Sequence, residues 1–251
     1  IKKFANRGKI NLFEDYKKLA ENSELIISCV GNDNDLKDIY LKKNKIFDGV
    51  KKNTIIVDHT TASFDITIKL FKKFKNKNAF FFDAPVSGGE IGAREGNLSI
   101  MVGGNKTKFS ILEKYLHCYY KSLIYMGNSG SGQLTKMVNQ ICVASIIQGL
   151  AEGLNFAKKK KLNVEKLLEV VRNGAAQSWQ LENRSLTMWK NQFNFGFMNK
   201  LMLKDLKILL EESNNSNIKL PITKKIKSFY VRLIKKGYSK EDTSNLIRLL
   251  K

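Results

Sequence analysis

A lysine and two amides lie on one face of a predicted helix near the middle of the chain. Lys136, Asn139 and Gln140 stand at positions i, i+3 and i+4, a spacing that places them side by side on an α-helix. Their neighbours are mostly apolar, so burial and the positive end of the helix dipole should lower the pKa of the lysine. Such an amine can exchange a proton with a hydroxyl near neutral pH. The alternative is a structural lysine whose amine reaches solvent.

A second candidate site is the segment 83–89, with the sequence DAPVSGG. It follows an apolar run typical of a buried strand, and ligands of open α/β sheets bind outside the carboxyl ends of strands. Ser87, Gly88 and Gly89 there offer a hydroxyl and unshielded backbone N–H groups to an anion. The alternative is a tight turn that needs glycine for its backbone conformation.

The segment 127–132, GNSGSG, imitates a phosphate-binding loop because it stands between a predicted strand and a predicted helix. It lacks the G-K-[ST] ending of a P-loop. A dinucleotide fingerprint would also need a second strand within ~30 residues and an acidic residue ~20 positions on, whereas a long helix follows here. We interpret these glycines as a flexible junction between two domains.

A further motif, FGFMNKLMLKDL, begins near Phe197 and contains Lys204 and Asp205. A lysine and an aspartate beside an apolar run fit either a pair that lines a cleft or an ordinary surface pair on a helix. The motif alone does not separate the two.

Several elements must position these residues. Short apolar runs predict buried strands at 25–30, 54–57, 79–82, 98–102 and 123–126. Helical patterns at 35–43 and 64–75 lie between the early runs, an alternation that predicts a parallel α/β sheet. From about 133 to 161 the pattern is one long helix, and the rest of the chain is also helical, with Asn163 and Pro221 as predicted helix starts. We therefore expect an α/β domain over 1–127 and an all-helical domain over 128–251.

The composition narrows the class of protein. The chain has 251 residues, three isolated cysteines and two histidines without partners at metal-ligand spacing. We therefore predict no metal site, no disulfides and a cytoplasmic location. The most apolar stretches, such as 141–147, are shorter than the ~20 residues of a membrane span, so no membrane association is expected.

The net charge of +21 points formally to nucleic acid or an acidic membrane surface as a partner. Its lysines occur in scattered groups, at 72–73, 158–161, 224–225 and 235–236, without the interleaved aromatic residues of a single-strand platform. We interpret the charge as compositional bias over solvated helix faces, and expect no nucleic acid partner.

The chain resembles the β-hydroxyacid dehydrogenases in five motifs that occur in the same order: DAPVSGGEIGAREGNLSIMVGG, GNSGSGQLTKMVNQ, GAAQSWQLENR, FGFMNKLMLKDL and LPIT. This family includes 3-hydroxyisobutyrate dehydrogenase and is more distantly similar to 6-phosphogluconate dehydrogenase. The resemblance implies a Rossmann-like domain that binds NAD or NADP, a long interdomain helix, and a helical domain that makes the contacts of a homodimer or homotetramer. It also implies hydride transfer between the nicotinamide and a short β-hydroxy acid or its semialdehyde.

The resemblance assigns catalytic and substrate roles to matching residues. Lys136 matches the family's catalytic lysine, the general acid/base. The family commonly has a second Asn where Gln140 stands, so either Asn139 or Gln140 orients the reacting hydroxyl. The small carboxylate substrate is held by the segment that matches Ser87, Gly88 and Gly89, and the pocket is closed at the positions of Phe197 and Asp205.

The cofactor positions match less completely. Thr61 matches a threonine near the nicotinamide ribose, and Lys204 matches a lysine near the cofactor. Val30 and Gly31 fall where the family usually has Leu-Pro, so the glycine departs from the pattern. By the family register the chain begins after the opening G-x-G-x-x-G strand and helix and the second strand, and we expect an N-terminally truncated, incomplete Rossmann-like domain.

Three alternatives stand beside a 3-hydroxyisobutyrate dehydrogenase-like oxidoreductase. One is a fragment that is inactive because it lacks the pyrophosphate-binding loop. Another is a non-catalytic basic binding protein on the same fold. The third, an imine-reducing relative, is disfavoured by Lys136, because similar proteins with that chemistry generally lack the lysine.

Overall fold

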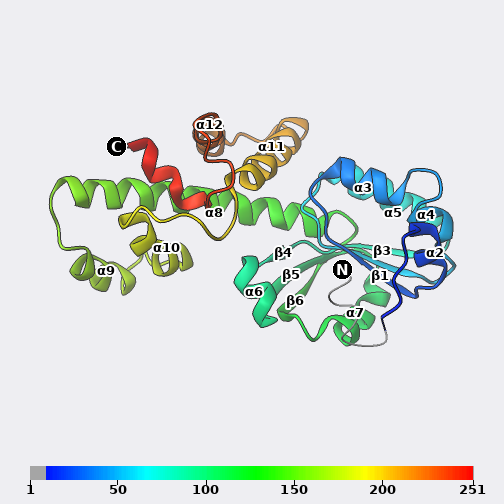
Figure 1. Cartoon of the computed structure of the whole chain (residues 1–251). Coiled ribbons are helices and arrows are strands. Elements are labelled where there is room, and N and C mark those ends of the chain that lie inside the picture. The colour runs from blue at the N-terminus through cyan, green and yellow to red at the C-terminus, as the bar shows by residue number, and fades with distance from the viewer. Residues whose placement is uncertain (1–9, 251) are drawn as a thin grey trace. The chain divides into compact units, whose positions relative to one another are not determined.

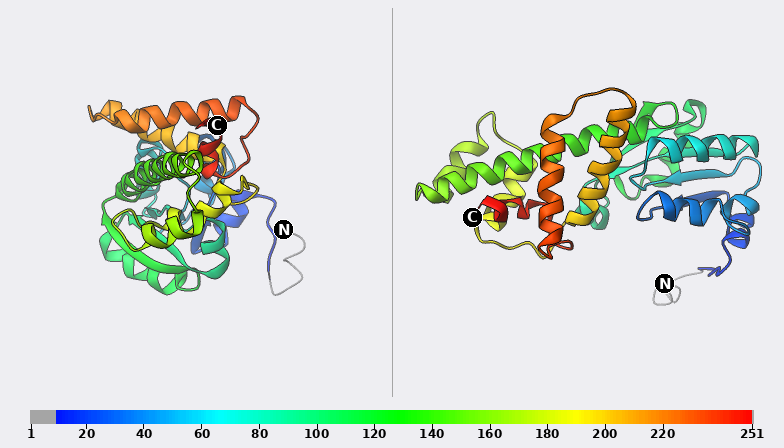
Figure 2. Two further views of the ribbon diagram at one scale, coloured as in Figure 1. Left: turned by 90° about the vertical axis from the view of Figure 1, so that its left-hand side faces the viewer. Right: turned by 90° about the horizontal axis from the view of Figure 1, so that it is seen from above.

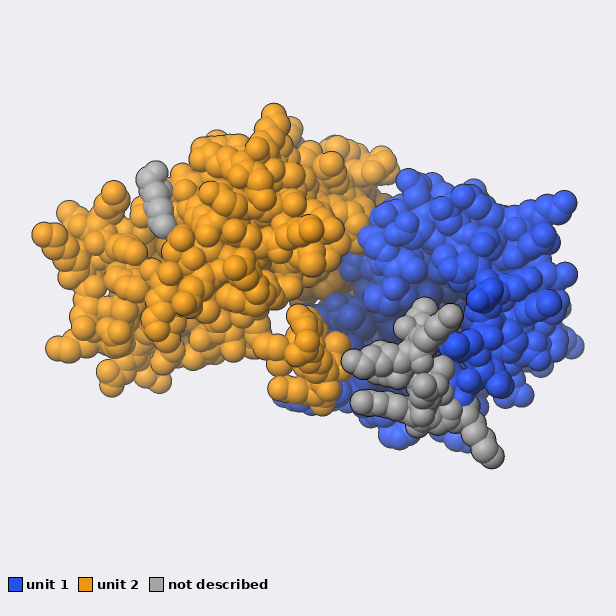
Figure 3. Space-filling model, in the orientation of Figure 1, with its two compact units in different colours: residues 1–87, 96–134 blue, residues 88–95, 135–251 orange. Residues whose placement is uncertain are grey.

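The computed structural model describes residues 10–250. The chain forms two compact units, shown in different colours in Figure 3. Unit 1 comprises residues 1–87 and 96–134, and unit 2 comprises residues 88–95 and 135–251. The sequence-based boundary at residue 127 stays a prediction. The units of the structure divide the chain differently, because residues 128–134, with the first turn of the long helix, belong to unit 1 and residues 88–95 belong to unit 2.

Unit 1 is built on one six-stranded sheet, ordered β1-β2-β3-β5-β4 with β6 beside β5. Its strands are β1 (Leu25–Ser28), β2 (Ile55–Asp58), β3 (Phe80–Asp83), β4 (Val86–Ser87), β5 (Leu98–Gly103) and β6 (Tyr120–Gly127). The first three are parallel, and their register aligns Ser28, Asp58 and Asp83 at the carboxyl ends. These ends are the edge where α/β sheets bind ligands.

Two strands of the sheet, β5 and β6, run opposite to the first three. β5 is antiparallel to both β3 and β4 and parallel to β6, which departs from the parallel sheet predicted from the alternation of strands and helices. A strand that returns directly beside its predecessor, as in a hairpin, runs antiparallel to it. β5 pairs with β4 in this antiparallel direction after a connection that contains the short helix at Gly89–Glu95, so the sheet is mixed.

Helices cover both faces of the sheet in unit 1 (Figure 1). They are α2 (Tyr16–Glu21), α3 (Asp33–Tyr40), α4 (Ile46–Gly49), α5 (Phe64–Asn76) and α7 (Phe109–Leu116), with a 3-10 turn at Lys106–Lys108. Alternation along the strands divides the core, because Ile56 and Phe81 pack with α3 and α5, whereas Val57 and Phe82 pack with α7. The helix predicted at 64–75 is confirmed by α5.

Unit 2 is helical. The long helix α8 (Ser131–Lys159) continues into it, followed by α9 (Val164–Arg172), α10 (Trp179–Trp189), α11 (Asn199–Asn215), α12 (Pro221–Lys235) and a 3-10 helix (Thr243–Leu250), while α6 (Gly89–Glu95) precedes it in the chain. The two orange helices α11 and α12 lie side by side (Figure 2). Asn163 caps α9 and Pro221 opens α12, as predicted. The predicted fold class, an α/β unit followed by a helical unit with a long helix, is confirmed.

Within the described residues, α8 is also the one helix that is long and apolar enough to cross a membrane by length and composition. The short apolar run 141–147 did not indicate this, because the helix is moderately apolar over its whole length. Ala144, Ile147 and Leu154 of α8 lie in the core of unit 2. That face of α8 therefore belongs to the interior of a folded unit.

Candidate active site

Lys136 is buried in unit 2 among charged partners. It lies in the second turn of α8 and is only 7% exposed, and Asp205 of α11 is 2% exposed. The Lys204 amine lies 3.1 Å from Asp205 Oδ1. Folding therefore brings two lysines and one carboxylate from two helices into one buried cluster.

The charges in this cluster shift each other's protonation. Burial lowers the pKa of Lys136, an effect that Asp205 opposes and Lys204 reinforces. Burial raises the pKa of Asp205, and the two lysines and Gln140 oppose that shift. The Lys136 amine is therefore deprotonated at a lower pH than an exposed lysine, as general acid/base chemistry requires.

The two amides form a chain that ends on Asp205. Gln140 is buried, and its Nε2 donates a hydrogen bond to Asp205 Oδ2 over 2.6 Å. Asn139 Nδ2 donates to Gln140 Oε1 over 2.8 Å. Both predicted amides therefore join the Lys136 cluster, with Gln140 in direct contact with the carboxylate.

Phe197 lies in the loop before α11, and its backbone N–H donates to Asp242 Oδ2 over 3.0 Å. Asp242 is buried and also accepts hydrogen bonds from the backbone N–H and hydroxyl of Ser244. Arg184 Nε lies 3.2 Å from Asp242 Oδ1. The loop that carries Phe197 is thus anchored on a buried ion pair.

The Arg184–Asp242 pair was not predicted from the sequence. The guanidinium of Arg184 also lies over the rings of Trp179 and Phe195, 4.9 Å from each centroid. Trp179 is part of the GAAQSW motif, but the motif did not indicate that Arg184 contacts its ring. Arg184 and Asp242 lie far apart in the sequence, and nothing in the residues around either one indicates that they form an ion pair.

The predicted carboxylate-binding segment is divided between the two units. Ser87 ends β4 in unit 1, and Gly88 and Gly89 lead into α6 in unit 2. Gly88 has φ 133° and Gly89 has φ 63°, a left-handed backbone region that favours glycine. No heavy atom lies within 4 Å of the position that a Cβ on Gly89 would take. The backbone conformation therefore explains why a glycine stands here, and there is open space beside the backbone.

The carboxyl ends of β1 and β2 hold the other predicted positions, Val30, Gly31 and Thr61. The backbone N–H of Val30 donates to Thr60 Oγ1 over 2.9 Å, and Thr60 Oγ1 donates to the buried Asp58 over 2.7 Å. This network joins the two strand ends. Burial raises the pKa of Asp58 to about 6, against the hydrogen bonds from Thr60 and Ser28.

Gln133, in the first turn of α8, forms hydrogen bonds with the residues on both sides of Thr61. Its side-chain Nε2 donates to the Thr60 carbonyl over 2.7 Å, and its Oε1 accepts from the Ala62 N–H over 3.1 Å. Gln133 is fully buried. It lies three positions before Lys136, and no sequence motif indicated a role for it.

The glycine-rich junction is shaped by packing. A Cβ on Gly130 would collide with the ring of Phe64, and one on Gly132 would collide with the backbone oxygens of Met101 and Asp83. Asp83 accepts hydrogen bonds from the N–H groups of Gly130 and Gln133, over 2.8 and 3.0 Å. A carboxylate already takes these donors at the start of α8, which agrees with a domain junction and leaves no phosphate cradle there.

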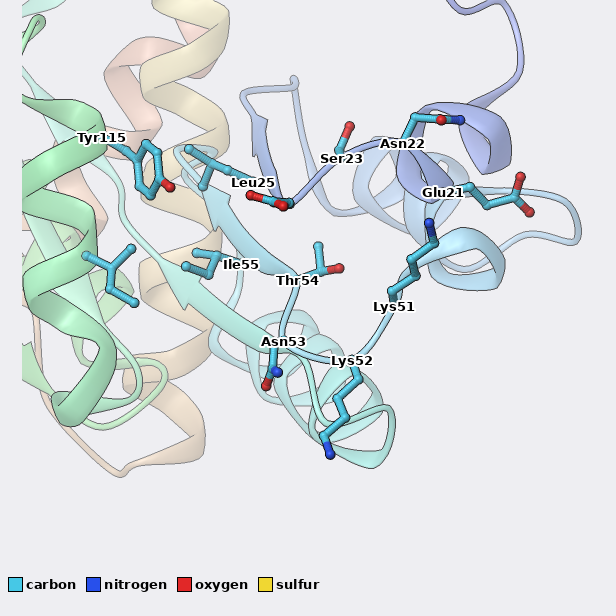
Figure 4. A pocket seen from close by; sticks show the side chains of 12 residues that line it. Glu21, Asn22, Ser23, Leu25, Lys51, Lys52, Asn53, Thr54, Ile55 and Tyr115 are labelled. Carbon is cyan, nitrogen blue, oxygen red and sulfur yellow. The ribbon is translucent and has the colours of Figure 1, made fainter.

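A hollow of about 600 Å³ lies at the opposite, amino ends of β1 and β2 (Figure 4). It is lined by residues of mixed charge, and Lys51 points toward Glu21 in the figure. None of the predicted site residues lines it. The predicted site residues therefore fall into two separate groups, the cluster around Lys136 in unit 2 and the strand ends at Val30 and Thr61 in unit 1.

Two family profiles match the chain. The profile described as the NAD binding domain of 6-phosphogluconate dehydrogenase matches residues 1–127. The profile described as NAD-binding of NADP-dependent 3-hydroxyisobutyrate dehydrogenase matches residues 130–250. The chain belongs to the β-hydroxyacid dehydrogenase family. It is accordingly an NAD(P)-dependent oxidoreductase that acts on hydroxyl groups.

Individual relatives and solved structures show how far the likeness extends. An uncharacterized oxidoreductase of Shewanella frigidimarina is 43% identical over 93% of this chain and 80% of its own length. The probable 3-hydroxyisobutyrate dehydrogenase-like 1, mitochondrial, of Arabidopsis thaliana is 34% identical over 96% of this chain and 72% of its own. The structure of Mycobacterium tuberculosis 3-hydroxyisobutyrate dehydrogenase with L-serine has a TM-score of 0.89 at 22% identity and covers 98% of this chain and 86% of that one, a likeness of fold.

The described residues fit one end of the NAD(P) of a β-hydroxyacid dehydrogenase. Val30, Gly31 and Thr61 lie at the carboxyl ends of parallel strands, where such cofactors bind, and hydrogen bonds through Thr60 and Gln133 hold the Val30 and Thr61 backbones in place. The start of α3 offers no phosphate site, because Asn32 caps it and Asp33 and Asp35 lie in its first turn.

Proposed function

We propose that this chain transfers a hydride reversibly between NAD(P) and the carbinol carbon of a short β-hydroxy acid or its semialdehyde. One observation carries the proposal: Lys136 is 7% exposed and has a lowered pKa beside Asp205. The names of relatives, such as 3-hydroxyisobutyrate dehydrogenase, mitochondrial, of Mus musculus, at 28% identity, support the substrate class. When bound, NAD(P) accepts or supplies the hydride.

In this proposal Lys136 moves the proton. Its neutral amine takes the hydroxyl proton of the hydroxy acid during oxidation, and its ammonium returns a proton to the carbonyl oxygen during reduction. Asp205 lies close enough to stabilise the ammonium form, and Lys204 balances the carboxylate. Burial keeps bulk water from competing for the amine.

The amides act as one positioning unit. Gln140 holds the Asp205 carboxylate, and Asn139 holds the Gln140 amide. We assign the orientation of the reacting hydroxyl to this pair, with Gln140 the more constrained member. Ser87, Gly88 and Gly89 hold the substrate carboxylate, Phe197 closes the pocket, and Val30, Gly31, Thr61 and Lys204 lie beside the cofactor.

We also infer a cytoplasmic homodimer or homotetramer. Among the described residues, α8 exposes large apolar side chains, with Val138 60% and Phe156 62% exposed. Gly149 and Gly153 of the same helix have no heavy atom within 4 Å of a Cβ position. An exposed apolar helix face of this kind supports association with a second copy, and sedimentation analysis measures the stoichiometry.

The test replaces Lys136 and measures turnover of a panel of short hydroxy acids with NAD and with NADP. Lys136→Ala should lower kcat by 10²-fold or more, the usual scale for a lost general acid/base. Affinity for NAD(P), measured by calorimetry, should change little. Near-unchanged turnover of a good substrate would overturn the assignment.

The pH profile separates chemistry from structure. For oxidation the neutral amine is the active form, so kcat/KM should rise with pH through a pKa below the ordinary 10.5 of lysine. Lys136→Arg keeps the positive charge and loses the titration. It should therefore be inactive over the whole range. A Lys136→Arg variant that retains the rising limb would show that another group titrates.

A further inference from the structure

A second hollow, of about 680 Å³, lies entirely within unit 1. Its walls come from α5, the start of β3, the turn after β5, the end of β6 and the loop at Lys52. This volume lies in the range of ligand-binding sites. No residue of the candidate active site lines it.

The floor of this hollow is aromatic. Phe71, Phe80 and Tyr125 line it and are each partly exposed. β3 and β5 pair at one position, Asp83 with Gly103. The Phe80 end of β3 is therefore not paired with β5. The Tyr125 hydroxyl donates to the Gly104 carbonyl over 3.2 Å, which holds its ring in place.

The rim of the hollow is uniformly positive. Lys52, Lys72, Lys75 and Lys106 line it, and no aspartate or glutamate does. In residues 10–250 none of these four lysines forms an ion pair. In Figure 4 Lys52 points away from Glu21, in contrast to its neighbour Lys51. We call these four lysines and the three aromatic residues of the floor the basic groove.

Folding creates a pattern that the linear sequence lacks. The four lysines come from three separate segments, and the aromatic residues between them come from α5, β3 and β6. In the sequence they read as scattered surface charge. In the groove, exposed lysines lie beside partly exposed aromatic side chains, one of which, Phe80, also has the Lys108 amine over its ring. Positive amines beside aromatic rings are the combination that binds single-stranded nucleic acid by phosphate contact and base stacking.

We propose that the basic groove binds a short stretch of single-stranded nucleic acid without sequence preference. Stacking on Phe71, Phe80 or Tyr125 suits every base, and the lysines follow the phosphates. A site for a free mononucleotide would need a few precisely placed polar groups to fix the base, and the groove offers flexible exposed lysines instead. The net charge of +21 raises the rate of encounter with a polyanion.

The test measures fluorescence anisotropy of a labelled single strand of about ten nucleotides, titrated at several salt concentrations. Four lysine–phosphate contacts predict a slope of log K against log salt of about −3, since each contributes about −0.7 on a single strand. The variant Lys72→Ala/Lys75→Ala/Lys106→Ala should reduce the slope to about −1 and weaken binding at least ten-fold at low salt.

The matched control removes the same charge elsewhere. Lys159→Ala/Lys160→Ala/Lys224→Ala replaces three exposed lysines of unit 2, and its affinity and slope should stay near those of the unaltered protein. Equal losses in the two triple variants would overturn the proposal, because binding would then follow net charge. Dehydrogenase turnover of the Lys72→Ala/Lys75→Ala/Lys106→Ala variant should be unchanged. A negative result for nucleic acid binding can therefore be told apart from a negative result for the proposed dehydrogenase activity.

The aromatic floor is tested by Tyr125→Leu against Tyr125→Phe. Loss of the ring should weaken the single strand by about ten-fold without altering the salt slope, because stacking contributes roughly 1–3 kcal/mol per base. The phenylalanine variant keeps the ring and loses only the hydrogen bond to Gly104, so it should bind more tightly than Tyr125→Leu. ATP that binds more tightly than the single strand, or poly-glutamate that displaces it at equal charge, would overturn the nucleic acid assignment.

Discussion

The Gln133 side chain donates a hydrogen bond from Nε2 to the carbonyl oxygen of Thr60 over 2.7 Å. Its Oε1 accepts a second one from the Ala62 N–H, so both backbone groups beside Thr61 are satisfied by one buried amide. The first turn of α8 thereby holds the loop at the carboxyl end of β2. Lys136, which we propose as the general acid/base, follows three positions later on the same helix.

Gln133→Leu should destabilise the protein and weaken NAD(P) binding. The variant leaves two buried backbone groups without partners, at about 1–3 kcal/mol each, so urea unfolding should show a loss of about 2–6 kcal/mol. Gln148→Leu is the control on the same helix, because Gln148 Oε1 already lacks a hydrogen bond within the described residues. A Gln133→Leu variant as stable as Gln148→Leu would contradict this role.

Asp58 predicts a pH-dependent stability. Burial raises the pKa of Asp58 from 3.8 to about 6, with Asp83 adding to the shift. The folded state therefore holds its proton more tightly than the unfolded chain. The resulting stabilisation of the folded state is present below about pH 4 and is lost as the pH rises to about 6. At 1.36 kcal/mol per pKa unit, the free energy of unfolding should fall by about 3 kcal/mol over this range.

Asp58→Asn removes this titration. The stability difference between the unaltered protein and the variant, measured by urea unfolding from pH 4 to 7, should change by about that amount in favour of the variant as pH rises. Asp65→Asn, at an exposed position of α5, is the control. A difference that does not vary with pH would show that the Asp58 carboxyl has an ordinary pKa.

Arg184→Met should be strongly destabilising. Its side chain is 13% exposed and Asp242 is 1% exposed, and removal of one partner of a buried pair leaves an uncompensated charge, which costs about 3–5 kcal/mol. Arg94→Met is the control, because the Arg94–Glu90 pair is exposed and such pairs contribute under about 1 kcal/mol. Equal unfolding midpoints for the two variants would contradict the anchoring role of Arg184.

Local pattern predicted much of the fold. The helix α5, the capping residue Asn163 and the start of α12 at Pro221 were all predicted from neighbouring residues, because helix periodicity and capping depend on contacts within a few positions of the chain. The reversed direction of β5 was not predicted. Strand direction depends on which strands pair, and pairing is a long-range choice.

The same division holds for the candidate site. The sequence by itself determined the family and its NAD(P) chemistry, because five motifs in order resemble that family. It also determined the shared face of Lys136, Asn139 and Gln140, because that face depends on helical spacing. Only the tertiary structure decided that Asp205 meets Gln140, that Gln133 brackets Thr61 and that scattered lysines surround an aromatic floor. Those contacts join residues far apart in the chain, and burial and hydrogen-bond satisfaction select them only when the whole core packs.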